Sequence, residues 1–144
     1  MGSVAFLCIM RHLHGTAHRV LMSTVSTAFH PILPVQRPWG SYQTLACGPG
    51  YLLKRIVVAP GQRISLQSHA HRREHWLVVA GPVQVTLDGR QFSLPVGGHC
   101  DIAVGQVHRL SNPGTQPAEI VEVQLGDDLR EDDITRFGDD YGRV

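Results

Sequence analysis

The residues best suited to chemistry stand in two glycine-framed stretches of the chain. The first reads G-x5-Q-x-H-x4-E-x6-G and contains Gln67, His69 and Glu74. The second reads G-x5-A-x-G-x2-H-x3-N and contains His108. Two imidazoles, a carboxylate and an amide oxygen are donors that a divalent metal accepts. The sequence therefore predicts that these four side chains hold one divalent ion, with Zn²⁺ preferred and Mn, Fe, Co or Ni as alternatives.

Alternation along a strand explains the spacing of the first stretch. Side chains of a strand point to opposite faces in turn, so Gln67, His69 and His71 share one face. A turn over residues 72–73 then lets Glu74 join them from the next strand. Because an imidazole titrates near neutral pH, His71 is either the general base of a reaction or a metal ligand in place of Gln67.

The composition is typical of one globular domain. The chain has 144 residues, of which 42% are hydrophobic, and this is enough for a single buried core. Its cysteines, Cys8, Cys47 and Cys100, are scattered and odd in number. That pattern argues against a disulfide framework or a cysteine zinc site, and it predicts a reducing, cytoplasmic location.

The net charge of +1 conceals an uneven distribution. Residues 1–73 contain eight Arg or Lys and no acid, whereas seven of the twelve acids fall within residues 127–140. A basic first half suits a small anionic ligand such as a phosphate. Neither nucleic acid nor membrane is expected as a partner. The chain has no Lys/Arg run interleaved with aromatic residues, and the apolar run over residues 4–10 is too short to span a bilayer.

Short apolar runs between turn residues predict an all-β sandwich or barrel. The expected strands are residues 51–59, 63–71, 75–80, 100–104, 107–110 and 118–125, together with a hairpin of residues 83–87 and 91–94 around Asp88-Gly89. The acidic segment after Gly126 is expected either to form a short helix or to wrap over the barrel. Residues 1–30 differ in character from the rest and are expected to be a mobile N-terminal extension.

Longer runs extend the two glycine-framed stretches. They are Arg37-Pro38-Trp39-Gly40, Lys54-Arg55-Ile56, residues 65–67 and 69–76, residues 108–114, residues 121–124, and residues 131–134 with 140–143. The glycine-framed stretches resemble the two motifs of the cupin superfamily, with Gln67 where the first His is usual and Ala103 where Pro is usual. The whole set, over residues 37–143, is similar to type II mannose-6-phosphate isomerase, which also forms the C-terminal part of bifunctional mannose-1-phosphate guanylyltransferases.

The resemblance implies a single cupin barrel, which is a double-stranded β-helix or jelly roll, over residues 31–144. It implies a metal-dependent interconversion of mannose 6-phosphate and fructose 6-phosphate. It also implies a homodimer, with a separate mannose-1-phosphate guanylyltransferase as a further partner. Two alternatives stay open at this point. One is a non-catalytic sugar-binding or regulatory cupin, and the other is a different cupin enzyme, such as an oxygenase or a sugar-phosphate epimerase.

Such an isomerase needs a base, positive charge near the reacting oxygens and a cation for the phosphate. Lys54 and Arg109 join His71 as expected catalytic residues, and Arg136 and Arg143 are expected to bind substrate. Arg109 directly follows His108, so on a continuous strand its side chain points away from the metal. Glu122, which shares one strand face with Gln124, is expected to bind substrate if that face is the inner one.

Overall fold

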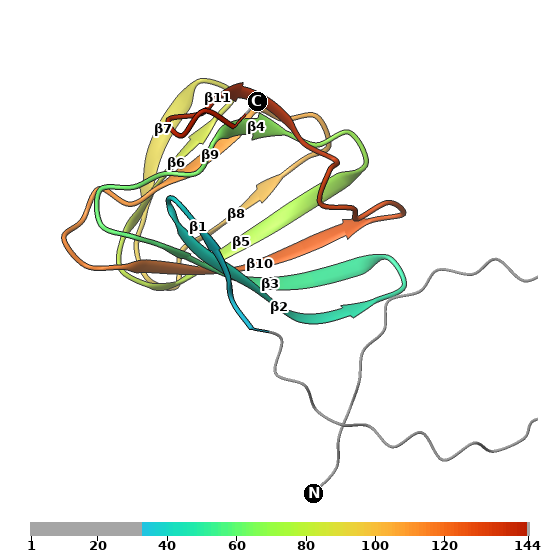
Figure 1. Ribbon diagram of the computed structural model, residues 1–144, viewed down its shortest axis with the longest axis horizontal. Coiled ribbons are helices and arrows are strands. Elements are labelled where there is room, and N and C mark those ends of the chain that lie inside the picture. Colours follow the sequence, from blue (N-terminus) through green and yellow to red (C-terminus); the bar gives the residue numbers. More distant parts are fainter. Residues whose placement is uncertain (1–32, 144) are drawn as a thin grey trace, which may run out of the picture.

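The fold consists of two antiparallel sheets that face each other (Figure 1). The computed structural model describes residues 33–143, so the extension expected over residues 1–30 lies outside the described residues. The first sheet has the order β1 (Val35–Arg37), β2 (Gly40–Gly48), β3 (Tyr51–Val58), β10 (Ala118–Gly126), β5 (Arg72–Ala80) and β8 (His99–Ile102). The second has the order β11 (Thr135–Gly138), β4 (Leu66–Ser68), β9 (His108–Ser111), β6 (Val83–Leu87) and β7 (Arg90–Leu94).

The all-β prediction is confirmed over the part of the chain that the structure describes. Residues 33–143 contain strands and turns but no helix, and hence no helix that could cross a membrane. Strand β10 lies between β3 and β5, so the end of the sequence packs beside two earlier segments (Figure 1). This arrangement brings side chains from three distant parts of the chain onto one inner face.

The space between the sheets is apolar at one end and polar at the other. Ile56 and Val58 on β3, Val78 on β5 and Ile120 on β10 point inward and belong to the hydrophobic core. Further along the same strands the inward positions become polar and stay buried: Lys54, Arg72, Glu74, Glu122 and Gln124. Buried polar groups need hydrogen-bond or charge partners, so the polar end is where a site is expected.

The hairpin predicted around Asp88-Gly89 is confirmed. Strands β6 and β7 pair from Val83 with Leu94 to Leu87 with Arg90. Asp88 and Gly89 have positive φ angles of 48° and 79°, as a two-residue type I′ turn requires. The Asp88 carboxylate also accepts hydrogen bonds from Val107 N–H and from the Gln106 amide, which join the turn to the segment before β9.

The turn expected over residues 72–73 lies instead at Ala70 and His71. Strand β4 ends at Ser68, and β5 already begins at Arg72. The Asp133 carboxylate accepts hydrogen bonds from the backbone N–H groups of Ala70 and His71, at 2.9 and 3.1 Å, and so holds the turn in this place. This long-range contact puts Arg72 in phase with Glu74, because alternate residues of a strand share a face.

The acidic segment after Gly126 wraps over the barrel, which is one of the two forms that the sequence predicts. It crosses the open polar end and then forms β11, which pairs with β4. Arg136 on β11 lies opposite Gln67 on β4, so the two side chains share the inner face of the second sheet.

Candidate functional site

Three buried side chains converge where the two sheets meet at the polar end. His69 follows β4, His108 begins β9 and Glu74 lies on β5. Glu74 Oε1 is 3.2 Å from His69 Nε2, and Glu74 Oε2 is 3.5 Å from His108 Nε2. The ligand atoms lie within 4.8 Å of one another, and no side chain of the three is more than 2% exposed. This spacing allows one metal ion to contact all three.

Both imidazoles are oriented for metal binding by backbone carbonyls. His69 Nδ1 donates a hydrogen bond to the Asp133 carbonyl at 2.5 Å, and His108 Nδ1 donates to the Gln106 carbonyl at 2.9 Å. These bonds leave each Nε2 with its lone pair toward Glu74. His108 Nε2 is buried and has no hydrogen-bond partner, so it is an unsatisfied atom that a cation would satisfy.

The protonation states of the two histidines also fit a metal. Burial, together with the nearby charge of Arg72, lowers the pKa of His69 to about 4. Burial lowers the pKa of His108 as well. Both rings are therefore neutral at pH 7, and a neutral imidazole is the form that coordinates a metal.

Gln67, the fourth predicted ligand, lies beside this group. Its Oε1 accepts a hydrogen bond from the Ser65 hydroxyl at 2.6 Å, and its Nε2 is 3.3 Å from His69 Nε2. A rotation of the amide by half a turn places Oε1 next to His69 instead. The Ser65 hydroxyl can then accept from the amide nitrogen, so the exchange keeps that hydrogen bond. Gln67 can thus present an oxygen to an ion held by the other three residues.

Arg72 is a site residue that the sequence analysis missed. Its Nε donates to Glu74 Oε1 at 3.0 Å and its Nη2 to His69 Nε2 at 3.1 Å. Its Nη1 donates to the carbonyls of Arg130 and Asp133. Binding of a metal to His69 requires Arg72 to release Nε2, while the two carbonyls can keep the guanidinium beside the site. The signal available in the sequence was the Arg72-x-Glu74 alternation, once β5 is taken to begin at residue 72.

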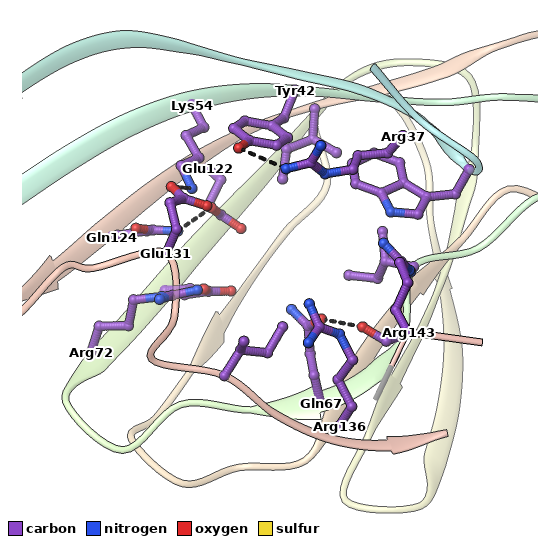
Figure 2. Close-up of a pocket in the computed structure, with 16 residues that line it drawn as sticks. Arg37, Tyr42, Lys54, Gln67, Arg72, Glu122, Gln124, Glu131, Arg136 and Arg143 are labelled. Carbon is purple, nitrogen blue, oxygen red and sulfur yellow. Dashed lines mark hydrogen bonds and ion pairs between the residues drawn. The ribbon is translucent and has the colours of Figure 1, made fainter. Parts of the chain in front are cut away.

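A pocket extends from this group between the two sheets. Glu74 and Gln67 reach its wall, whereas His69 and His108 are not among the residues that line it. Figure 2 shows Lys54, Arg72, Glu122 and Gln124 to one side of the pocket, and Arg37, Arg136 and Arg143 to the other. The pocket therefore has an acid–base side, where Arg72 contacts Glu74, and a side with three guanidinium groups, where Gln67 lies beside Arg136 (Figure 2).

Glu122 is held firmly on the acid–base side. Its carboxylate accepts hydrogen bonds from Trp76 Nε1 at 2.9 Å and from the Gln124 amide at 2.7 Å. Burial, together with the negative charge of Glu74, raises the pKa of Glu122 to about 7. Lys54 is its cross-strand neighbour on β3, is buried, and forms an ion pair with Glu131 of the wrapped segment.

On the other side, Arg136 has a hydrogen-bond donor to spare. Its Nε is buried and has no hydrogen-bond partner. Arg143 is held in place by Asp139, whose carboxylate accepts from its backbone and guanidinium N–H groups, and it lies over the Tyr141 ring. Arg37 donates to the Tyr42 hydroxyl at 3.3 Å. Three guanidinium groups around one opening favour an anion, and above all a phosphate, which they can bind through paired N–H groups.

The comparisons with known proteins agree with this geometry. The family described as "Mannose-6-phosphate isomerase C-terminal" matches residues 25–139. The chain belongs to this family. It is 52% identical over 110 residues to the alginate biosynthesis protein AlgA of Pseudomonas aeruginosa, which covers 76% of this chain and 23% of AlgA. It is 48% identical over 110 residues to a mannose-1-phosphate guanylyltransferase of Escherichia coli strain K12, with coverage of 76% and 23%. The chain thus spans about a quarter of the length of these curated relatives.

A solved structure of similar shape confirms the fold that the family resemblance implied. A conserved protein with a double-stranded β-helix domain from Klebsiella pneumoniae has a TM-score of 0.60 and 21% sequence identity. The match covers 72% of this chain and 83% of that one. The described part of this family member is therefore a single double-stranded β-helix barrel of the cupin type.

The structure brings most of the predicted site residues of this family member together. Lys54, Glu122, Arg136 and Arg143 all line the pocket, and Glu122 and Gln124 share its inner face. Sequence analysis did not single out Arg37 or Glu131 as site residues, because nothing local shows that the first strand and the wrapped segment meet the same pocket.

His71 and Arg109 lie outside the pocket. His71 is exposed in the turn after Ala70, because β4 ends at Ser68 and the expected alternation does not reach residue 71. Arg109 lies on the continuous strand β9 next to His108, so it points to the opposite face, where its Nη2 donates to the Gly138 carbonyl. The geometric argument for a direct role of either residue in the reaction therefore fails.

Proposed function

We propose that this chain is a metal-dependent aldose–ketose isomerase that interconverts mannose 6-phosphate and fructose 6-phosphate. The main support is one pocket with a metal-ligand group and buried acid–base residues on one side and three arginines on the other. A hexose 6-phosphate has a carbonyl at one end and an anion at the other, and the two sides match these ends. The family, and relatives named for alginate biosynthesis and for mannose-1-phosphate guanylyltransfer, favour a mannose phosphate used in polysaccharide biosynthesis.

The phosphate of the substrate binds between Arg136, Arg143 and Arg37. Arg136 offers its unpaired, buried Nε, which makes it the strongest of the three anchors. Arg143 is pre-oriented by Asp139, and a guanidinium that is already held loses little conformational entropy on binding. Phosphate at this end directs C1 and C2 of the open-chain sugar toward Glu74 and Glu122.

The metal is held by His69, Glu74 and His108, with Gln67 as the fourth ligand. The two nitrogen and two oxygen donors suit Zn²⁺ first, and also accommodate Mn, Fe, Co or Ni. When bound, the ion supplies a Lewis acid that polarises the sugar carbonyl and orients the C1 and C2 oxygens. Trp76 Nε1 donates to Glu74 Oε2 at 3.2 Å and helps to keep that carboxylate in place.

Glu122 moves the proton. It takes the hydrogen from C2 of the aldose as a proton, and the electron pair forms the C1–C2 double bond of an enediolate. Glu122 then returns the proton to C1, and the hydroxyl proton of O2 passes to O1, which gives the ketose. With its pKa raised to about 7 by burial, this carboxyl exists in both forms near neutral pH, which suits transfer in either direction. Lys54, beside Glu122, stabilises the negative charge that develops on the oxygens. Lys54 thus keeps the catalytic role expected from the sequence, and Glu122 takes the place of His71 as the proposed base.

The proposal is tested by an isomerase assay on the purified full chain, stripped of metal and then resupplied with each candidate ion. We expect fructose 6-phosphate to form from mannose 6-phosphate only with metal. Arg136→Ala should raise KM at least about 10-fold, since a charged hydrogen bond contributes about 1.5–3 kcal/mol. Arg90→Ala, which removes an exposed arginine on β7, is the matched control and should leave KM unchanged.

Folded, metal-loaded protein without turnover contradicts the isomerase. If such protein still binds mannose 6-phosphate, it is a sugar-binding cupin. If it binds none, a different cupin reaction is indicated. For the partner, we propose a mannose-1-phosphate guanylyltransferase, on the same or a separate chain. The support is that one relative bears this name and that the aligned region covers only 23% of its length.

A further inference from the structure

The chain after β11 forms a short turn that carries Arg143 to the pocket. Strand β11 ends at Gly138, and within residues 33–143 no backbone-to-backbone hydrogen bond ties residues 139–143 to the barrel. Arg143 nevertheless lines the pocket, on the same side as Arg136 (Figure 2). We call residues 139–143 the C-terminal turn. Its position relative to the barrel, and with it the position of Arg143, depends on side-chain contacts.

Tyr141 is the main anchor of the C-terminal turn. Its ring packs against the hydrophobic core, and its hydroxyl donates a hydrogen bond to Gln62 Oε1 at 2.7 Å. The same hydroxyl oxygen accepts from the Arg63 backbone N–H at 3.5 Å. A hydroxyl can donate once and accept twice, so one atom makes both contacts. Tyr141 is not among the residues that line the pocket, so its contacts are with the barrel and not with a ligand.

The surface that receives this hydroxyl belongs to the second sheet. The Gln62 carbonyl accepts from the Asn112 N–H at 2.9 Å, and the Ile64 N–H donates to the Leu110 carbonyl at 3.0 Å. Residues 62–64 thus extend the sheet beside the end of β9 and lead into β4. A side chain supported by a sheet is held more precisely than one supported by a free loop. The barrel therefore offers a rigid seat for the C-terminal turn.

Two ion pairs complete the arrangement. Arg63 donates to both carboxylate oxygens of Asp140, at 2.6 and 3.1 Å, and so ties the C-terminal turn to the barrel a second time. Arg143 donates to both oxygens of Asp139, and its guanidinium lies 5.1 Å from the centre of the Tyr141 ring. The Asp139 side chain is only 3% exposed and does not line the pocket, so it holds the guanidinium without facing a bound anion.

We propose that Tyr141 is a positioning residue for phosphate recognition, which seats the C-terminal turn on the barrel so that Arg143 faces the pocket. The inference rests on the proposed function, because it takes the arginine side of the pocket as the phosphate end. A guanidinium that is already in place loses less conformational entropy on binding, so the seated turn raises the affinity for phosphate. Selection of a phosphorylated sugar over the free sugar then depends in part on a hydroxyl that touches neither.

Phosphorus NMR titration of the metal-loaded, full 144-residue chain with inorganic phosphate tests this role. Tyr141→Phe removes the hydroxyl and keeps the ring. It should raise the phosphate Kd about 5-fold, the size of effect expected for one neutral hydrogen bond. In the isomerase assay it should raise KM for mannose 6-phosphate by a similar factor and leave kcat unchanged. Tyr51→Phe is the matched control, because Tyr51 is 39% exposed on β3; its phosphate Kd should stay the same.

A double-mutant cycle separates positioning from a general loss of structure. In an Arg143→Ala background, Tyr141→Phe should weaken phosphate binding no further, because the arginine through which the hydroxyl acts is already absent. The same loss in both backgrounds contradicts the proposal. Circular dichroism verifies that each variant is folded. Should Tyr141→Phe not fold, Asp140→Asn removes the charge of the second tie, and it should also weaken phosphate binding in the unmodified chain but not in Arg143→Ala.

The outcomes for Tyr141 and for the isomerase are separable. If the chain binds phosphate without turning over mannose 6-phosphate, the isomerase is contradicted, whereas weaker phosphate binding by Tyr141→Phe still supports the positioning role. If the chain turns over mannose 6-phosphate and Tyr141→Phe changes neither the phosphate Kd nor KM, the isomerase stands and the positioning role is overturned. A chain that binds no phosphate overturns the role together with the phosphate end of the pocket on which it rests.

Discussion

At the scale of single residues, the pocket depends on a few buried polar side chains whose partners are fixed. Trp76 Nε1 donates to both Glu74 and Glu122, so one indole holds the proposed metal ligand Glu74 beside the proposed proton carrier Glu122. Burial raises the pKa of Glu122 to about 7, which suits a group that takes up and returns a proton near neutral pH.

Glu122→Gln tests the proton carrier. A base must be deprotonated to accept a proton, and the pKa of Glu122 is raised to about 7 by burial, so kcat should rise with pH through about 7. The amide keeps an acceptor for Trp76 but cannot take the proton, so kcat should fall at least about 100-fold and the limb near pH 7 should disappear. Glu119→Gln, on the outer face of the same strand, should change neither kcat nor its pH dependence. If kcat of Glu122→Gln still rises with pH through about 7, Glu122 is not the proton carrier.

At the scale of elements, the wrapped segment between β10 and β11 positions His69 in the proposed metal site. The Asp133 carbonyl accepts from His69 Nδ1, and its carboxylate fixes the turn that separates His69 from β5. Burial by itself raises the pKa of Asp133, but the two backbone N–H donors and Arg72 hold it below its usual value. The carboxylate is therefore charged at neutral pH and keeps both hydrogen bonds.

Asp133→Ala removes the carboxylate that holds the turn after His69, and it should lower the metal affinity by about 10- to 100-fold. This is the range typical of residues that orient a metal ligand. Calorimetric titration of the metal-free protein measures the affinity without reference to turnover. Asp132→Ala removes a neighbouring carboxylate that is 76% exposed, and it should leave the affinity unchanged. Equal affinities for the two variants would show that Asp133 does not position His69.

At the scale of the whole molecule, the metal-ligand group joins the two sheets. Glu74 belongs to the first sheet, whereas His108 and Gln67 belong to the second. An ion bound by all of them stabilises the folded barrel and has no comparable site in the unfolded chain. The bound ion would thus serve the proposed reaction and also link the two sheets.

Thermal unfolding with and without a chelator tests whether the ion stabilises the barrel by linking the two sheets. At a free metal concentration about 1,000 times Kd, binding contributes about 4 kcal/mol of stability, so Tm should fall clearly on chelation. His108→Ala should abolish the metal-dependent part of Tm. His99→Ala, which removes an exposed histidine on β8, should retain it. An identical Tm with and without metal, in protein that binds the ion, would show that the ion does not stabilise the fold.

Local rules were enough for much of the fold. The hairpin at Asp88-Gly89 follows from turn chemistry, and the strands that became β3, β6 and β10 follow from apolar runs between turn residues. The nine-residue strand β2 was not predicted, since its run from Gly40 to Gly48 is rich in glycine and polar residues. It forms because β3 offers a partner along nearly its full length.

The sequence by itself determined the class of the fold, because apolar runs between turn residues are a local property, and the two glycine-framed stretches predicted that His69, Glu74 and His108 converge. Only the tertiary structure decided which neighbours share the pocket. Asp133, 62 residues from His71 along the chain, fixes the turn at residues 70–71, and this excludes His71 from the inner face and places Arg72 on it. Strand pairing also decided that Arg136 lies inside, since its partner Gln67 is distant in sequence. The side on which a residue lies after a turn depends on where the turn falls, and here a long-range contact sets that place.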